Sequence, residues 1–541
     1  MKLFRLEWMV LVGAFAIPAF ILSGNLWNVG IASGYIDPVM QLGAQDEATY
    51  TREAITMARD GGWMTPDFLG RWVFEKPPLL MWLSAVSMKL FGIGRVSARM
   101  PVVFAGALIC GLCFSVVRRR RGAAAGLATA AMALSSQILF TMSRHNMTDI
   151  LLAAAGMCAF AILLRDPELR NTRSFAGFAI AAAAGIMAKS VAGILVIAVM
   201  AVVVGLGCRR WGRAALAAML AMVLASPWFL YNLILHRDWF LADMGFQLIT
   251  IGTASHQTSA ENHLWFYIVR ILNSDLVPLL LALAAVPALV RAVRRREAAG
   301  LLAASYFAIY FAALMVFRFH SEQYLCWFVP SLILIAGLYS PLLNGKGAAA
   351  MIALVSIAFA IKLANPDREF GVSILPGSTL AAAPVLSQYC MEHRATDLYI
   401  LGVDDEFYSA ALPLHRVRYG WIDPTDMIAR EHPHLAYLGI LIAAADLSQI
   451  DEKLPLYRER LHAWGLDSTR AVATGVSAHD VPELLRIIHD HPESDFLVAR
   501  SILPDPERDQ AHWVVFANAE FSLLESKERV ATETAGWSCG M

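Results

Sequence analysis

The feature that most constrains this chain is a succession of apolar segments, each near the roughly 20 residues that a membrane-spanning helix needs. Hydrophobic residues make up 57% of the 541 residues and charged residues only 16%, which excludes a soluble, disordered or fibrous protein. The sequence predicts a polytopic α-helical membrane protein with about 11–13 transmembrane helices, counting one or two short ones within 77–91. The longer segments lie near 8–24, 97–117, 122–141, 147–164, 173–188, 190–207, 213–234, 273–291, 299–317, 323–341 and 347–363.

Basic residues indicate how these spans are oriented. The N-terminus carries Lys2 and Arg5, and every second loop after it is rich in arginine, beginning with Arg118 to Arg121. Because basic loops stay in the cytoplasm, we expect a cytoplasmic N-terminus and an external C-terminal region. No small-residue cleavage site follows the first span, so we interpret that span as retained. The net charge of zero provides no basic excess for binding nucleic acid.

The composition of the chain changes after the last span. Residues 1–363 form the predicted transmembrane domain, whereas 364–541 is more charged and contains strand-length apolar stretches. We interpret this second part as a soluble α/β domain, with strands near 397–403, 436–444, 495–500 and 513–517 and helices near 383–393 and 480–490. Its cysteines, Cys390 and Cys539, could form a disulfide in an oxidising compartment or remain two separate thiols.

The outer loop at 25–96 is long, acidic and aromatic. Its stretch 46–60 has helical spacing and ends at Gly61 and Gly62. Asp46 lies at the start of this helix, where the helix dipole favours a carboxylate, and Tyr50 follows one turn later on the same face. A capped amphipathic helix on the membrane surface is the simpler interpretation of this pattern.

The same outer loop contains a lysine followed by two prolines. Proline favours an extended residue before it and suits the first turn of a helix, so Lys76 is expected just ahead of a helix N-terminus. An ammonium group beside a helix N-terminus suits an anion, and phosphate most naturally. The alternative is a lysine that reaches toward lipid headgroups.

Further charged and polar residues occur in the other predicted outer turns. They include Arg144 and Asp149 in one turn and Lys189 between two apolar runs. His263 and His320 each precede a span. Charges close to a bilayer are costly and are often functional, although each could also be an ordinary helix-end charge or a structural histidine.

Three segments in the first third of the chain resemble the lipid-dependent GT-C glycosyltransferases, a superfamily that includes aminoarabinose transferases of lipid A and protein O-mannosyltransferases. They are DEATYTREAITMARDGGWMTP at 46–66, FEKPPLLMWLSAVSMKLFG at 74–92 and VSARMPVVFAGAL at 96–108. RHNMTD at 144–149, MAKSVAGILV at 187–196 and FRFHSEQYLCWFVPSL at 317–332 fit later landmarks of that family. The chain departs from the family at Thr49, where an arginine is usual, and Arg52 or Arg144 could replace that arginine.

The resemblance implies roles for individual residues. Asp46 and Asp149 correspond to the family's catalytic carboxylates, and Lys76, Lys189 and Arg144 are expected to bind the donor phosphate. Substrate contacts are expected from Glu47, Tyr50, Glu75, His263, His320 and Tyr324. No cofactor is required, although a divalent cation at Asp46 and Glu75 stays an open alternative.

The resemblance also implies an activity and a place in the cell. The expected reaction moves a sugar from a polyprenyl-phosphate carrier, with inversion, to a hydroxyl or phosphate acceptor on lipid A, a glycan or a protein. It would take place on the periplasmic face of a bacterial inner membrane. A transporter or flippase of a lipid-linked sugar is the alternative, since it also needs many spans and intramembrane charge.

Overall fold

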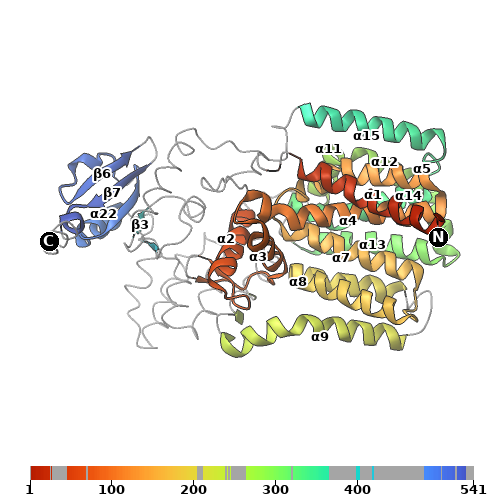
Figure 1. Cartoon of the computed structure of the whole chain (residues 1–541), viewed down its shortest axis with the longest axis horizontal. Coiled ribbons are helices and arrows are strands. Elements are labelled where there is room, and N and C mark those ends of the chain that lie inside the picture. Colours follow the sequence, from red (N-terminus) through yellow and green to blue (C-terminus); the bar gives the residue numbers. More distant parts are fainter. Residues whose placement is uncertain are drawn as a thin grey trace.

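A computed structural model of the whole chain shows a bundle of long helices (Figure 1). The structure describes residues 2–24, 26, 45–68, 71–203, 211–237, 240, 241, 244, 263–317, 321–364, 398–401, 417–419, 481–500, 503–517 and 521–531. Predicted elements at 383–393 and 436–444 lie outside these residues, as do Cys390 and Cys539.

Every predicted membrane span falls on a helix. Within the described residues, seven helices are long and apolar enough to cross a membrane, and shorter apolar helices accompany them. The prediction of a polytopic helical membrane protein is therefore confirmed. The bundle comprises α1 (Lys2–Ser23), α4 (Arg95–Arg121), α5 (Ala123–Ser135), α6 (Gln137–Met142), α7 (Thr148–Arg165), α8 (Thr172–Val203), α9 (Trp211–Leu235), α12 (Leu276–Arg294), α13 (Ala298–Val316), α14 (Leu325–Tyr339) and α15 (Lys346–Ala364).

Helix α8 contains the two spans predicted on either side of Lys189. Its backbone leaves the helical region at Lys189 and at Ser190, where φ is 45°. The two halves then fold against each other so tightly that a Cβ on Gly193 would lie 2.2 Å from the carbonyl carbon of Gly185. Only glycine permits this approach, so α8 is a hairpin of two helices with Lys189 at its turn.

The arginine-rich last turn of α4 is anchored to another helix. Gly122 ends α4 with φ of 88°, a conformation that glycine adopts without steric cost. Arg121 donates to the carbonyl oxygens of Gly337 and Ser340 at the end of α14, at 3.1 and 2.7 Å. A guanidinium group suits the unsatisfied carbonyls at a helix C-terminus, so this contact fixes the ends of α4 and α14 together.

The described residues between α1 and α4 lie at one end of the bundle (Figure 1). Helix α2 (Gln45–Asp60) stops at Gly61 and Gly62, both with positive φ, as the sequence predicts. A short hairpin of β1 (Asp67–Phe68) and β2 (Arg71–Trp72) follows. Helix α3 (Leu79–Phe91) then begins directly after Pro78. Two further short helices are α11 (His263–Ser274) and the 3₁₀ turn η3 (Glu322–Tyr324).

The described part of the C-terminal region contains a mixed sheet. Its strands are β3 (Leu398–Leu401), β4 (Val417–Tyr419), β5 (Asp495–Ala499), β6 (His512–Ala517) and β7 (Phe521–Ser526), in the order β4-β3-β5-β7-β6. Neighbours β4, β3 and β5 are parallel, whereas β7 and β6 pair antiparallel. Helix α22 (Val481–Asp490) and the 3₁₀ turn η8 (Pro506–Arg508) accompany the sheet. The strands expected near 397–403, 495–500 and 513–517 and the helix near 480–490 are present; the domain boundary at 363 stays a prediction.

Candidate active site

The start of α2 presents Asp46 on the same face as Tyr50. Asp46 is partly buried in the first turn, and Tyr50 is buried one turn later. Burial raises the pKa of the Tyr50 phenol well above its usual value, and the negative charges of Asp46, Asp149 and Glu75 raise that pKa further. Carboxylates that lie far apart in the sequence therefore come within electrostatic range of one phenol.

Lys76 lies partly buried before the two prolines that lead into α3. Burial lowers the pKa of its ammonium group, while Glu75 and Asp46 act in the opposite direction. Lys189 and Asp149 also influence that pKa, so they lie within electrostatic range of Lys76. Acidic and basic groups from the first outer loop, α7 and α8 thus converge on one site.

Asp149 and Lys189 form a buried ion pair. Asp149 lies in the first turn of α7 and has no exposed surface, and its Oδ1 accepts from Lys189 Nζ at 2.6 Å. The same oxygen accepts from the indole Nε1 of Trp327 at 2.6 Å. Oδ2 of Asp149 is also buried and has no hydrogen-bond partner among the described residues. This carboxylate therefore keeps one oxygen available for a further donor.

Two aromatic rings enclose the ammonium group of Lys189. Its Nζ lies 4.7 Å from the ring centroid of Tyr324 and 5.0 Å from that of Trp327, and these rings stack at 4.5 Å. A cation over two ring faces is stabilised without water. Trp327 follows Tyr324 by three residues, a helical spacing that could have indicated its role in the sequence.

Arg144, expected at the donor phosphate, makes contacts with the end of α1. Its Nη1 donates to the carbonyl oxygens of Leu22 and Gly24 at 3.0 and 2.8 Å, and its guanidinium covers the ring of Phe140 at 5.0 Å. The side chain is buried and satisfies carbonyls at the C-terminal end of α1. Arg144 therefore anchors α1, and its role at the donor phosphate stays a prediction.

Glu47, expected to contact substrate, is enclosed by other groups of the protein. It has no exposed surface, and its two oxygens accept from Arg99 Nε and Nη2 at 2.7 and 3.1 Å. The imidazole Nδ1 of His145 lies 3.0 Å away, and the backbone N–H of Asn146 donates at 2.7 Å. Burial alone would raise the pKa of Glu47, but Arg99 and His145 lower it to about 2. A carboxylate with this many donors holds the fold together, and nothing in the local sequence indicates Arg99 or Asn146 as its partners.

The remaining expected residues are only partly described. Tyr324 contributes to the aromatic enclosure of Lys189. His263 begins α11, but its side chain is outside the described residues, as are the side chain of Arg52 and the whole of His320. Within the described part of the chain, no three His, Cys, Asp or Glu side chains gather as a metal-binding group. Asp46 and Glu75 remain the residues that could hold a divalent cation.

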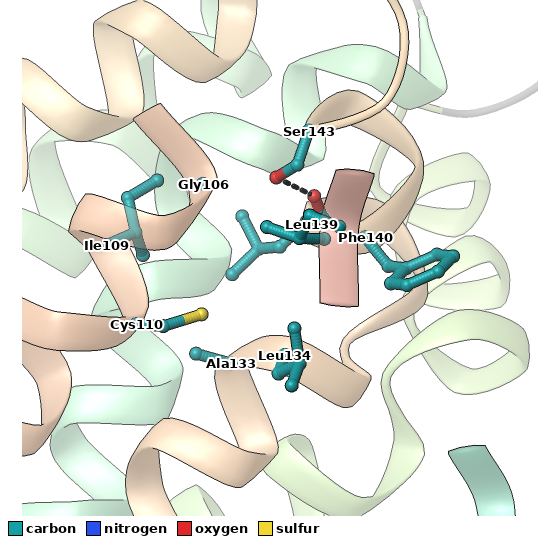
Figure 2. Close-up of a pocket in the computed structure, with 9 residues that line it drawn as sticks. Gly106, Ile109, Cys110, Ala133, Leu134, Leu139, Phe140 and Ser143 are labelled. Atoms are coloured by element: carbon teal, nitrogen blue, oxygen red, sulfur yellow. Dashed lines mark hydrogen bonds between the residues drawn. The ribbon is translucent and has the colours of Figure 1, made fainter. Parts of the chain in front are cut away.

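A small apolar pocket lies apart from these charges, between α1, α4, α5 and α6 (Figure 2). In Figure 2 the hydroxyl of Ser143 turns back to donate to the carbonyl oxygen of Leu139 at 2.5 Å. A Cβ on Gly106 would lie 2.0 Å from that hydroxyl oxygen, so glycine is needed there for close packing. The pocket is lined by Leu22, Gly106, Ile109, Cys110, Ala133, Leu134, Leu139, Phe140 and Ser143, none of them charged.

The chain is similar to several known proteins over different parts of its length. Residues 75–231 match the family of dolichyl-phosphate-mannose-protein mannosyltransferases. ArnT from Cupriavidus metallidurans, solved with undecaprenyl phosphate, aligns over 96% of this chain and 98% of its own, with a TM-score of 0.58 and 17% identity. An oligosaccharyltransferase from Archaeoglobus fulgidus aligns over 77% of this chain and 64% of its own, with a TM-score of 0.53 and 13% identity.

The chain has the GT-C glycosyltransferase fold. The resemblance inferred from the sequence is thereby confirmed at the level of fold. Two similar sequences are undecaprenyl phosphate-α-4-amino-4-deoxy-L-arabinose arabinosyl transferases. The protein from Edwardsiella ictaluri is 28% identical over 200 residues, and the one from Shewanella sediminis is 26% identical over 291. The alignments span 34% and 50% of this chain, and 35% and 50% of those relatives.

Proposed function

We propose that this protein is a membrane glycosyltransferase that moves a sugar from a polyprenyl-phosphate carrier to a hydroxyl or phosphate acceptor. The observation that carries the proposal is that Asp46, Asp149 and Lys189 lie within electrostatic range of Lys76, with Asp149 and Lys189 joined in a buried ion pair. The arabinosyl transferases among its relatives, and the ArnT structure with undecaprenyl phosphate, support a lipid-phosphate donor. The acceptor belongs to lipid A, another glycan or a protein.

In the proposed reaction, Asp46 acts as the general base. It takes the proton from the acceptor hydroxyl, whose oxygen forms a bond to the anomeric carbon. The bond between that carbon and the phosphate oxygen breaks on the opposite side of the sugar, so the configuration inverts. A positioned carboxylate can contribute about 10²–10⁴-fold to such a step.

Lys76 stabilises the polyprenyl phosphate that leaves. The two prolines restrict the backbone that carries Lys76, and the side chain is partly shielded from water, which favours a cation positioned before charge develops on the phosphate. Lys189 is engaged with Asp149 and the two aromatic rings, and we assign it to holding Asp149 in place. The buried Oδ2 of Asp149 then orients the acceptor.

The reaction is placed on the periplasmic face of a bacterial inner membrane, with the N-terminus cytoplasmic and the C-terminal domain periplasmic. The alternation of basic loops along the sequence supports this orientation. A transporter or flippase is less favoured, because alternating access places its site near the membrane midplane, whereas Asp149 and Lys189 lie at helix ends.

Mass spectrometry of lipid A and envelope glycans, from cells with and without the protein, tests the proposed function. We expect one glycan class to gain a sugar, and the rate of that gain to fall by about 10²–10⁴-fold in Asp46→Asn, leaving a residual rate that can be measured, and to fall in Lys76→Ala as well. Arg59→Gln, an exposed change on the same helix α2, is the matched control. A wild-type rate in Asp46→Asn would remove the base assignment, and unchanged donor affinity and rate in Lys76→Ala would remove the phosphate role. Chelation with EDTA tests the divalent-cation alternative separately.

A further inference from the structure

Asn146 lies in the turn before α7, contacts both α2 and α3, and is completely buried. Its backbone N–H donates to Glu47 Oε1 at 2.7 Å, and its side-chain Nδ2 donates to Thr51 Oγ1 at 3.0 Å. Its Oδ1 accepts from the hydroxyl of Ser84 on α3 at 3.0 Å. One residue in the turn before α7 therefore holds both helices of the first outer loop.

The two α2 residues that Asn146 holds lie one turn apart. Glu47 and Thr51 share a face of α2, because residues four apart are neighbours on a helix surface. Two bonded points along one face fix the helix both along its axis and in rotation about that axis. Arg99 reinforces the first point through its paired bonds to Glu47.

Asp46 and Tyr50 occupy the adjacent face of α2, about 100° around the axis. The rotational setting of α2 therefore decides where the Asp46 carboxylate points. A rotation of about 10° would move a group at the helix surface by about 1 Å. A displacement of about 1 Å can reduce a reaction rate by about 10²-fold.

We propose that Asn146, acting through Glu47 and Thr51, is a positioning residue that sets the direction of the Asp46 carboxylate. The same segment carries Asp149 three residues later, at the start of α7. The turn at 144–149 therefore fixes the spacing between the two carboxylates of the proposed site. Asn146 does not touch substrate itself. The inference rests on the proposed function of Asp46.

The test compares single and double variants in purified membranes. The readout is the rate at which the glycan identified above gains its sugar, together with the affinity for undecaprenyl phosphate. We expect Asn146→Ala to lower kcat at least about tenfold, with undecaprenyl phosphate affinity changed less than about twofold. In an Asp46→Asn background, Asn146→Ala should cause no further loss, because it acts only through that carboxylate.

Thr51 supplies a milder variant and its control. Thr51→Val keeps the shape of the side chain and removes the oxygen that Asn146 Nδ2 donates to, whereas Thr51→Ser keeps that oxygen. We expect Thr51→Val to lower kcat in the same direction as Asn146→Ala, and Thr51→Ser to restore it. This pair keeps the inference testable if Asn146→Ala fails to fold.

Two results would overturn the positioning role. One is an equal loss from Asn146→Ala with and without Asp46, which would indicate a general effect on the fold. The other is unchanged kcat in both Asn146→Ala and Thr51→Val. A wild-type rate in Asp46→Asn would instead remove the proposed function, so the two failures are distinguishable.

Discussion

Glu47 and Asp149 are both fully buried carboxylates beside a basic side chain, but their oxygens are satisfied in opposite ways. Glu47 accepts from two nitrogens of Arg99 and from the backbone of Asn146, with His145 also in contact. Asp149 uses only Oδ1, which accepts from Lys189 and Trp327. Its Oδ2 has no protein partner among the described residues.

The two carboxylates therefore differ in their proposed roles. Glu47 stabilises the fold, whereas Asp149 has an oxygen for a substrate. A buried carboxylate with all of its lone pairs engaged rigidifies the elements around it. A buried oxygen without a partner costs stability unless a ligand supplies the donor, which is how a binding group differs from a structural one. The cations beside them also differ. Arg99 donates from two nitrogens to Glu47, whereas Lys189 donates to Asp149 and also lies close to two aromatic rings. Substitutions of Glu47 and Asp149 test whether the two carboxylates differ in this way.

Glu47→Leu should produce the largest loss of stability. It leaves Arg99 buried without its counter-charge, which costs about 3–5 kcal/mol in unfolding free energy. Thermal unfolding of the detergent-solubilised protein measures this loss. The double variant Glu47→Leu, Arg99→Leu should be less destabilised than the single variant, because no uncompensated charge remains. Equal destabilisation of both would show that the ion pair is not what holds α2.

Asp149→Asn should show the reverse pattern, with a large loss of activity and a smaller loss of stability. We expect transfer to fall by about 10²–10³-fold, because the charged oxygen that orients the acceptor is lost. Stability should fall by less than about 2 kcal/mol, since an amide oxygen can still accept from Lys189 and Trp327. Both quantities are measured on one preparation. A stability loss as large as that of Glu47→Leu would contradict the proposed difference in role between Glu47 and Asp149.

Much of the fold could be predicted from the sequence, because local requirements determine it. A span in lipid needs a continuous apolar run, so the helices were visible as such. The turn of the α8 hairpin was marked by Lys189, and the start of α3 by Pro77 and Pro78. These features depend on residues close together in the chain.

The partners of the charged residues could not be predicted, because packing decides them. Arg99 and Glu47 are 52 positions apart, and nothing local indicates that they meet. Asp46 and Glu47 are adjacent acids, and the local sequence does not distinguish them. In the structure Glu47 is fully buried and hydrogen-bonded, whereas Asp46 is only partly buried. Nothing local in the sequence indicates that Arg144 donates to the carbonyl oxygens of Leu22 and Gly24.

The pH dependence of stability provides a third test, of intermediate size. The pKa of Glu47 is lowered to about 2 from its usual 4.5, so the native state favours its charged form. The resulting stability is fully present above about pH 5 and is lost as the pH falls toward 2, on the order of 3 kcal/mol. The thermal midpoint of the wild type should therefore drop between pH 5 and pH 3. Glu47→Gln should drop less over that interval, and an equal slope in both proteins would contradict the ion pair.

The aromatic enclosure of Lys189 should give the smallest effect. Tyr324→Leu removes a ring whose centroid lies 4.7 Å from the ammonium nitrogen, at a cost of about 1 kcal/mol. Tyr324→Phe keeps the ring and should retain most of this contribution, so it is the matched control. Because Lys189 holds Asp149, Tyr324→Leu should also lower the transfer rate more than Tyr324→Phe does. If both variants lost the same activity, the Tyr324 hydroxyl would matter and the ring would not, and the enclosure would depend on Trp327 alone.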